Sequence, residues 1–302
     1  MNELTGPPDL YISSFLNLPP DLSNPEKSTI QVLPLPLDIT CSWKSGTSEG
    51  PAAIVEASHH IELYDEEVGF EPVEEVGGIV THPAPDLPAD PEAAAIAVEE
   101  IAAALIDESR LMVALGGEHS ITYPLVRAHR EIWPDLCVLQ IDAHADLRDS
   151  YHGSRYNHAC PMRRINDMGV HVTALGIRSV DSSEIHLLEG DLRKTFPAHQ
   201  VVGRLGELID EIIQSLPEEN LYITIDLDGL DPSVVGAVGT PVPGGFDWFE
   251  TLYLLRILFR TKNVIGADVV ELSPREGFHS SDSVAARLVY KMVAYSAEKS
   301  RV

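Results

Sequence analysis

The chain is 302 residues long and 44% of them are hydrophobic, which is enough for one large core. Its formal net charge of −26 argues against nucleic-acid binding and would favour the approach of metal ions or cationic substrates, although acidity by itself more often serves solubility or a salt-rich habitat. The sequence has neither an apolar run that could span a bilayer nor a basic start followed by an apolar run, so we expect a cytoplasmic protein without membrane association. Three scattered cysteines without a CxxC pair are typical of reduced thiols.

Proline punctuates the start of the chain, as in "GPPDL" and "NLPPDL", which predicts an N-terminal arm or cap over residues 1–28. Residues 29–302 contain no repeat of fixed period and no low-complexity linker, so we expect them to form a single domain.

Short apolar segments alternate with helical patterns along this domain. Strands are predicted at "IQVLPLPLD", "RLMVALG", "DLCVLQID", "HVTALGI", "HQVVG", "NLYITID" and "VIGADVVEL". Helices are predicted at "PAAIVEASHHIEL", "DPEAAAIAVEEIAAALIDES", "ITYPLVRAHREIW", "PMRRINDM", "SSEIHLLEG", "RLGELIDEIIQSL", "DWFETLYLLRILF" and "SDSVAARLVYKMVAYSAEK". In the second of these, Asp90 suits the N-cap and Pro91 the first helical position. The alternation predicts an α/β fold with three α/β/α layers and a central, mostly parallel sheet, whose ligands bind beyond the carboxyl ends of the strands.

Four of the predicted strands end in acidic residues and histidines. Residues two apart in a strand point to the same side, so Asp142, His144 and Asp146 of "IDAHADLRD" would converge. The residues at the four strand ends are Gly116, Gly117, Glu118 and His119; Asp142, His144 and Asp146; Asp226, Asp228 and Asp231; and Asp268 and Glu271. Carboxylates this close repel one another unless a cation lies between them. The four strand ends together therefore predict a metal site.

Taken singly, these signals are weaker. A lone DxHxD is more often a solvated strand end, and the glycines of "GGEHS" could serve only a turn. "DLDGLDP" lacks the twelve-residue ligand loop of an EF-hand. Carboxylate-rich ligation with a minority of imidazole suits Mn²⁺ better than a thiol-rich zinc site does.

The number of carboxylates exceeds what one ion needs. Asp142 and Asp226 can each bridge two metals, which leaves four terminal ligands: His119, His144, Asp146 and Asp228. Such two-metal sites activate a water for hydrolysis at neutral pH.

The segments "GGEHS", "DAHAD", "DLDGLDP" followed by "GTPVPGG", and "VVELSP" resemble the ureohydrolases, the arginase and agmatinase family. Their order and separations match over nearly the whole chain, and "YNHACPMRR" and "GTPVPGG" are more similar to the agmatinase branch. The resemblance implies one α/β/α ureohydrolase domain over residues 29–302 and a binuclear manganese centre with two Mn²⁺ per subunit. One ion would be held by His119, Asp142, Asp146 and Asp226, and the other by His144, Asp142, Asp226 and Asp228. It further implies that a metal-bridging hydroxide attacks the guanidinium carbon and that urea and an amine are released.

Further roles follow from matched positions. Glu271 would pair with the guanidinium, His158 would protonate the leaving amine, and the Thr240 hydroxyl would lie near the substrate. We interpret Glu118 as a residue that orients a ligand and Asp231 as the cap of the turn before Pro232.

The substrate is expected to be agmatine, hydrolysed to putrescine and urea as in polyamine biosynthesis, with Asp149 or a neighbouring acid meeting its far ammonium. Arg148 stands where arginases carry Asn, which lowers arginine as a candidate. Guanidinobutyrate, formiminoglutamate and aminopropylagmatine stay open, and we interpret Arg148 as a structural ion-pair partner. A non-catalytic metal-binding relative and a single-zinc deacylase are the rival classes. Family members form trimers or hexamers, so we expect a homo-oligomer.

Overall fold

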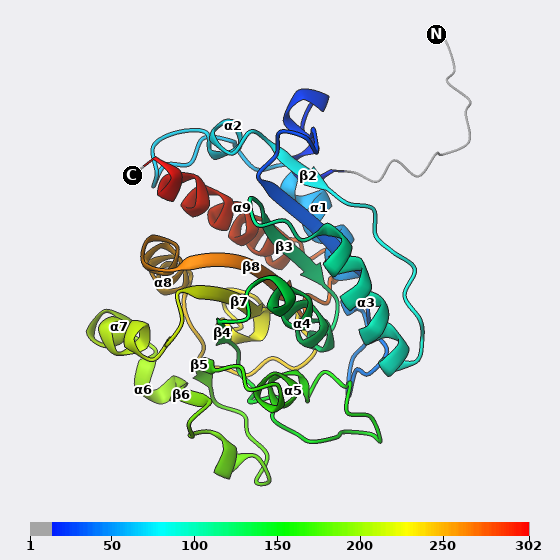
Figure 1. Ribbon diagram of the computed structural model, residues 1–302, viewed down its shortest axis with the longest axis vertical. Coiled ribbons are helices and arrows are strands. Elements are labelled where there is room, and N and C mark those ends of the chain that lie inside the picture. Colours follow the sequence, from blue (N-terminus) through cyan, green and yellow to red (C-terminus); the bar gives the residue numbers. More distant parts are fainter. Residues whose placement is uncertain (1–13, 302) are drawn as a thin grey trace.

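The structure is a computed structural model that describes residues 14–301. At its centre is an eight-stranded sheet with the order β2-β1-β3-β8-β7-β4-β5-β6, in which all paired strands run parallel (Figure 1). The strands are β1 (Ile30–Leu35), β2 (Ile79–Thr81), β3 (Leu111–Gly116), β4 (Leu136–Ile141), β5 (Val172–Ile177), β6 (Arg193–Pro197), β7 (Asn220–Asp226) and β8 (Asn263–Val270).

Helices cover both faces of this sheet (Figure 1). One apolar core contains side chains of α1, α7, α8 and α9, and a second contains side chains of α3, α4 and α5. The helices are α1 (Gly50–Ser58), α2 (Pro72–Glu75), α3 (Pro91–Leu105), α4 (Thr122–Ile132), α5 (Pro161–Asp167), α6 (Ala198–Val201), α7 (Leu205–Gln214), α8 (Trp248–Thr261) and α9 (Ser280–Ser300). Short 3₁₀ turns are η1 (Phe15–Asn17), η2 (Pro20–Leu22), η3 (Thr47–Glu49), η4 (His119–Ile121), η5 (Ile185–Leu187) and η6 (Leu227–Gly229). The predicted three-layer α/β/α architecture is confirmed.

Local sequence signals act as predicted at several element ends. The Asp90 side chain accepts a hydrogen bond from the Ala93 amide, and Pro91 opens α3. The central strands are buried along almost their full length, as strands covered on both faces must be, which explains their continuous apolar runs.

Two predictions of secondary structure were wrong, and one strand was missed. "HQVVG" is largely the helical turn α6, and the strand of this region is β6, which precedes it. Pro197 ends that strand because it has no N–H to donate, and two valines do not distinguish a strand from a helix. "SSEIHLLEG" forms only the single turn η5, and β2 was not predicted.

The first described residues, from residue 14 on, pack against the rest of the domain. Residues 1–13 of the predicted arm lie outside the described residues. Phe15 is fully buried in the core, and its amide donates to the Thr81 side chain. Within residues 14–301, no helix combines the length and the hydropathy needed to cross a bilayer.

The sheet order explains why the candidate residues gather. β3, β8, β7 and β4 are consecutive neighbours, and these are the four strands whose carboxyl ends carry the predicted ligands. Because they run parallel, their carboxyl ends lie along one edge of the sheet.

Candidate metal and active site

A cavity of about 140 Å³ lies at this edge of the sheet. Its lining includes seven of the residues selected from the sequence: His119, His144, Asp146, His158, Asp226, Thr240 and Glu271. Asp142 and Asp228 are buried next to them. The structure therefore brings all six predicted metal ligands together.

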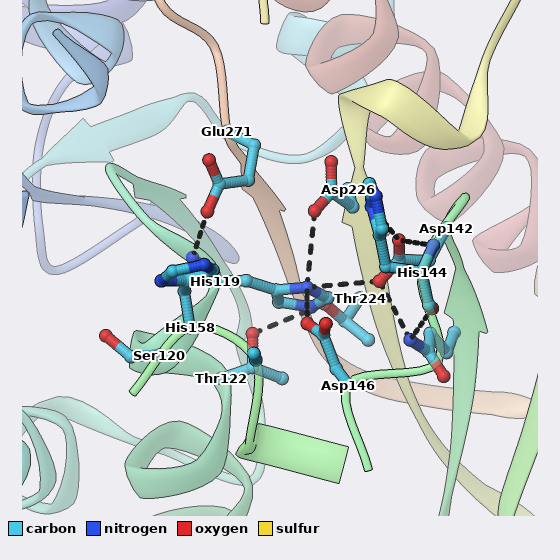
Figure 2. A network of polar contacts seen from close by, with 12 residues as sticks. His119, Ser120, Thr122, Asp142, His144, Asp146, His158, Thr224, Asp226 and Glu271 are labelled. Carbon is cyan, nitrogen blue, oxygen red and sulfur yellow. Dashed lines mark hydrogen bonds and ion pairs between the residues drawn. The ribbon is translucent and has the colours of Figure 1, made fainter. Parts of the chain in front are cut away.

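His119 is the centre of the first ligand group. Its Nδ1 lies 3.2 Å from Asp142 Oδ2, 3.0 Å from Asp146 Oδ2 and 3.3 Å from Asp226 Oδ2. Figure 2 shows these three carboxylates approaching the His119 ring. Although four side chains meet there, this nitrogen is buried and has no hydrogen-bond partner in the described part of the chain.

His144 anchors the second group. Its Nδ1 lies 3.0 Å from Asp228 Oδ2 and 3.8 Å from Asp142 Oδ1. Since Asp142 Oδ2 faces His119 and Oδ1 faces His144, its carboxylate lies between the two groups, as expected of a bridging ligand.

The electrostatics of both groups fit divalent cations. Burial and the neighbouring Asp142 raise the pKa of Asp146 to about 6, because two carboxylates repel each other there. Burial opposes protonation of His144, yet the charge of Asp228 raises its pKa to about 10. The ligand atoms of His119, Asp142 and Asp146 lie within 4.8 Å of one another, as do those of Asp142, His144 and Asp228. An unpartnered buried imidazole nitrogen among carboxylates is the donor set that a metal ion requires.

Two of the site residues have backbone conformations that residues other than glycine rarely adopt. Asp146 has φ 52° and Glu271 has φ 68°. Strained conformations of this kind occur where the surrounding structure holds a functional side chain in place. Gly229 of "DLDGLDP" allows the backbone to approach Asp142 closely, since a Cβ at this position would lie 2.7 Å from the Asp142 amide nitrogen.

A buried chain of hydrogen bonds orients the His119 ring. Nε2 lies 2.9 Å from Thr224 Oγ1, and this hydroxyl donates to Asp268 Oδ1 at 2.6 Å. Tyr222 donates to the other oxygen of Asp268. With the Thr224 proton directed at Asp268, Nε2 carries the ring proton and Nδ1 is free to bind a metal.

Glu271 and Thr240 lie beside the two groups. Glu271 Oε1 accepts the His119 amide at 2.7 Å, and burial together with the charge of Glu118 raises its pKa to about 8. Thr240 Oγ1 donates to Asp228 Oδ2 at 3.3 Å.

His158 is held by a separate loop. Its Nδ1 lies 3.1 Å from Thr40 Oγ1, and burial lowers its pKa to about 4, so the ring is neutral at neutral pH. Glu118 accepts the amides of Ile39 and Thr40 and also the Thr40 hydroxyl. It thus holds the loop that positions His158, and it does not contact a predicted metal ligand through these bonds.

The structure places Asp149 outside the cavity lining. Its carboxylate is 64% exposed and pairs with Arg164 at 2.7 Å and with Arg155 at 3.2 Å. Asp231 caps its turn, since it accepts the Ser233 and Gly244 amides.

Sequence reasoning missed the acids that line the cavity after β5. Asp181 and Glu184 lie there, and Asp181 pairs with Arg148 at 3.2 Å. Arg148 also stacks on Tyr151, with its guanidinium 4.6 Å from the ring centroid. Their signal was available, because "GIRSVDSSE" follows a predicted strand as the other site segments do.

Comparison with known proteins agrees with this geometry. The arginase family profile matches residues 28–294. The chain belongs to the arginase family. It is 36% identical to the N(1)-aminopropylagmatine ureohydrolase of Synechocystis sp. over 99% of this chain and 98% of that protein. It is 40% identical to the enzyme of the same name from Thermus thermophilus, over 89% of this chain and 90% of that protein.

A solved structure gives the same result. The agmatine ureohydrolase of Thermoplasma volcanium is 30% identical and superposes with a TM-score of 0.82, covering 93% of this chain and 94% of its own. The predicted membership of the arginase family is confirmed, and this family member is a hydrolase of the ureohydrolase type.

Proposed function

We propose that this protein hydrolyses the guanidinium group of an agmatine-type amine, with two Mn²⁺ ions, to urea and the free amine. The observation that carries the proposal is the pair of His/Asp groups that share Asp142 beside the buried carboxylate of Glu271. The two ions, when bound, would supply a water activated as a nucleophile at neutral pH.

The ligands divide into two sets around Asp142 and Asp226. His119 and Asp146 would complete one site, and His144 with Asp228 the other. Carboxylate-rich ligation without thiolate favours Mn²⁺ over Zn²⁺.

The remaining residues act on the substrate. The Glu271 carboxylate faces the cavity and would accept two N–H bonds from the planar guanidinium, a pairing that also favours its ionised form. Thr240 would donate or accept a hydrogen bond close to Asp228. Neutral His158 would take a proton at its free Nε2 and deliver it to the leaving amine.

The far end of the substrate would meet Asp181. This carboxylate lines the cavity beside Glu184 and is paired with Arg148, so an incoming ammonium would compete with a guanidinium of the protein itself. This contact replaces the one expected from Asp149, which is engaged with Arg164 outside the cavity.

Two candidate substrates carry a cationic tail. The relatives with 36% and 40% identity are named for N(1)-aminopropylagmatine, which favours the longer amine, with spermidine as its product. The similar structure is named for agmatine, which supports agmatine as the second candidate.

A urea assay with Mn²⁺ and matched guanidines tests the proposal. We expect kcat/KM to be highest for N(1)-aminopropylagmatine, then agmatine, with arginine and guanidinobutyrate at least about tenfold lower because they place a carboxylate near Asp181. Turnover of arginine or guanidinobutyrate without turnover of either amine would overturn it. Asp142→Asn should lose nearly all urea production, and full activity of that variant would exclude the two-metal mechanism.

A further inference from the structure

Gln140 is a fully buried amide in β4, two residues before Asp142. Its Nε2 donates to Asp142 Oδ2 at 2.8 Å and to the carbonyl oxygen of His144 at 3.1 Å. One amide group therefore holds the shared carboxylate and the backbone of a ligand from the other group.

Arg193 holds this amide from the edge of the sheet. Its Nη2 donates to Gln140 Oε1 at 2.9 Å and to the Ala145 carbonyl at 3.4 Å. An arginine can only donate, so it fixes the oxygen of the Gln140 amide on its own side and directs the NH₂ group toward Asp142.

The register of β4, β5 and β6 explains why the Arg193 side chain can contact Gln140. Gln140 of β4 is aligned with Ala174 of β5, and Ala174 with Thr195 of β6. Thr195 Oγ1 accepts from Arg193 Nε at 3.3 Å and steadies the other side of the group.

Burying the Arg193 guanidinium costs free energy, because its charge and its donors are only partly compensated. Arg193 is 3% exposed, its Nη1 has no hydrogen-bond partner within residues 14–301, and its bonds go to uncharged acceptors. Burial lowers its pKa to about 10, against the attraction of Asp142 and Asp146, so it remains a cation at neutral pH. Gln140 therefore lies between the positive charge of Arg193 and the carboxylate of Asp142.

We propose that Gln140 and Arg193 are positioning residues that fix the two oxygens of Asp142 between the two metal sites. The proposal rests on the proposed metal centre. With Oδ2 held by Gln140, Asp142 keeps Oδ2 toward His119 and Oδ1 toward His144. The His144 amide also donates to Oδ1 at 2.6 Å, so loss of the Gln140 bond frees Oδ2 alone and weakens the bridge between the sites without abolishing it.

The test is a titration of the metal-stripped protein with Mn²⁺. The EPR signal of free Mn²⁺ measures the affinity, and the signal of the spin-coupled Mn²⁺ pair measures how far both sites are filled. Gln140→Met keeps the length of the side chain but removes the donor, and Arg193→Met keeps the length but removes the guanidinium. Each should weaken Mn²⁺ binding about 10–100-fold and diminish the coupled-pair signal. Thr195→Val, the matched control, removes the Arg193 Nε contact but leaves the Gln140 bond, and should stay within about threefold of wild type.

Coupling separates positioning from a general structural effect. Because Arg193 is proposed to act through Gln140, Gln140→Met combined with Arg193→Met should bind Mn²⁺ no more than about threefold more weakly than the single variant with the lower affinity. Thermal unfolding of the metal-free proteins identifies a variant that fails to fold. Arg193→Lys, which keeps the charge and one donor toward Gln140 Oε1, then takes its place with a smaller but measurable loss of affinity. Wild-type Mn²⁺ affinity in the variants, losses that multiply, or an equal loss in Thr195→Val would overturn the positioning role alone. A wild-type protein that binds no Mn²⁺ would overturn the metal centre and this role together.

Discussion

The Glu271 carboxylate accepts the backbone amide of His119 at 2.7 Å. The bond joins the end of β8 to the turn after β3, and it uses Oε1 only, so the carboxylate remains attached to the metal-ligand segment while it faces the cavity. The residue proposed to bind the guanidinium is thereby held at a fixed place relative to a proposed metal ligand.

Glu271→Gln should remove guanidinium binding without disturbing the metal ligands. The glutamine Oε1 can still accept the His119 amide, but the charge that pairs with the guanidinium is lost. Loss of one partner of a buried charge pair costs about 2–5 kcal/mol, so kcat/KM should fall about 30- to 5,000-fold in a urea assay. Mn²⁺ content should be unchanged, and Asp149→Asn, which neutralises a carboxylate outside the cavity, should keep wild-type activity. Equal losses in both variants would contradict this role.

Asp181→Asn should act on the tail of the substrate. Asparagine can still accept the Ser183 amide and hydroxyl, so the loop is preserved, but the tail ammonium loses its counter-charge. We expect KM for the amine substrates to rise about fivefold with little change in kcat, since a partly exposed pair contributes about 1 kcal/mol. A simple alkylguanidine without an ammonium serves as the control, and its kinetics should not change. If KM rises equally for both, Asp181 does not bind the tail.

His158→Asn should slow the chemical step. Burial keeps the His158 pKa at about 4, so the wild-type ring is neutral above that pH and able to accept a proton. Loss of a positioned proton-transfer group should lower kcat about 10²–10⁴-fold, with KM nearly constant, as single-turnover urea release would show. His152→Asn changes an exposed histidine of the same loop and should retain activity. An unchanged kcat for His158→Asn would remove the residue from the mechanism.

The cluster of proposed metal ligands could be predicted from sequence because strand ends of a parallel sheet lie at one edge. Apolar runs located the strands, and acidic residues directly after them had to lie at one edge of the sheet whatever the order of the strands. The order itself, with β3, β8, β7 and β4 adjacent, came only from the structure.

The acid proposed to meet the substrate tail could not be predicted in the same way. Asp149 and Asp181 both lie in loops, and their difference depends on which arginine each meets: Asp149 pairs with Arg164 of α5, and Asp181 pairs with Arg148. Such pairs depend on loop conformation, which no periodic pattern encodes. The Arg193–Gln140 contact likewise required the register of β6, a strand that was predicted at the wrong residues.

His129 should make stability depend on pH. It is buried with Nε2 unpartnered in the described residues, and burial lowers its pKa to about 4 from 6.5. Between these values the unfolded chain binds more protons, so stability is lost as pH falls from 6.5 to 4, by about 3 kcal/mol from this residue. His129→Gln, which does not titrate, should be less stable at pH 7 but should show a shallower loss in urea unfolding across this range. His60→Gln, at an exposed position, should keep the wild-type slope, and an identical slope for His129→Gln would contradict the prediction.

Lys291 and Asp65 should contribute to stability without affecting catalysis. Lys291 Nζ lies 2.8 Å from Asp65 Oδ2 and 3.2 Å from Glu67 Oε2, and both Lys291 and Asp65 are 2% exposed. Asp65→Asn leaves a buried ammonium with a weakened partner and should lower the free energy of unfolding by about 3–5 kcal/mol. The matched control is Glu66→Gln, which removes an exposed carboxylate 3.5 Å from the same ammonium and should cost less than about 1 kcal/mol.

Replacing both partners tests the same pair from the other side. Asp65→Asn combined with Lys291→Met removes the ammonium and keeps an acceptor for the Glu67 and Val68 amides, so this double variant should recover much of the stability that Asp65→Asn alone loses. Neither residue lines the cavity, so the folded variants should keep wild-type kcat and KM in the urea assay. A double variant less stable than Asp65→Asn would show that the ion pair itself, not the avoidance of an unpaired charge, stabilises the packing of α9.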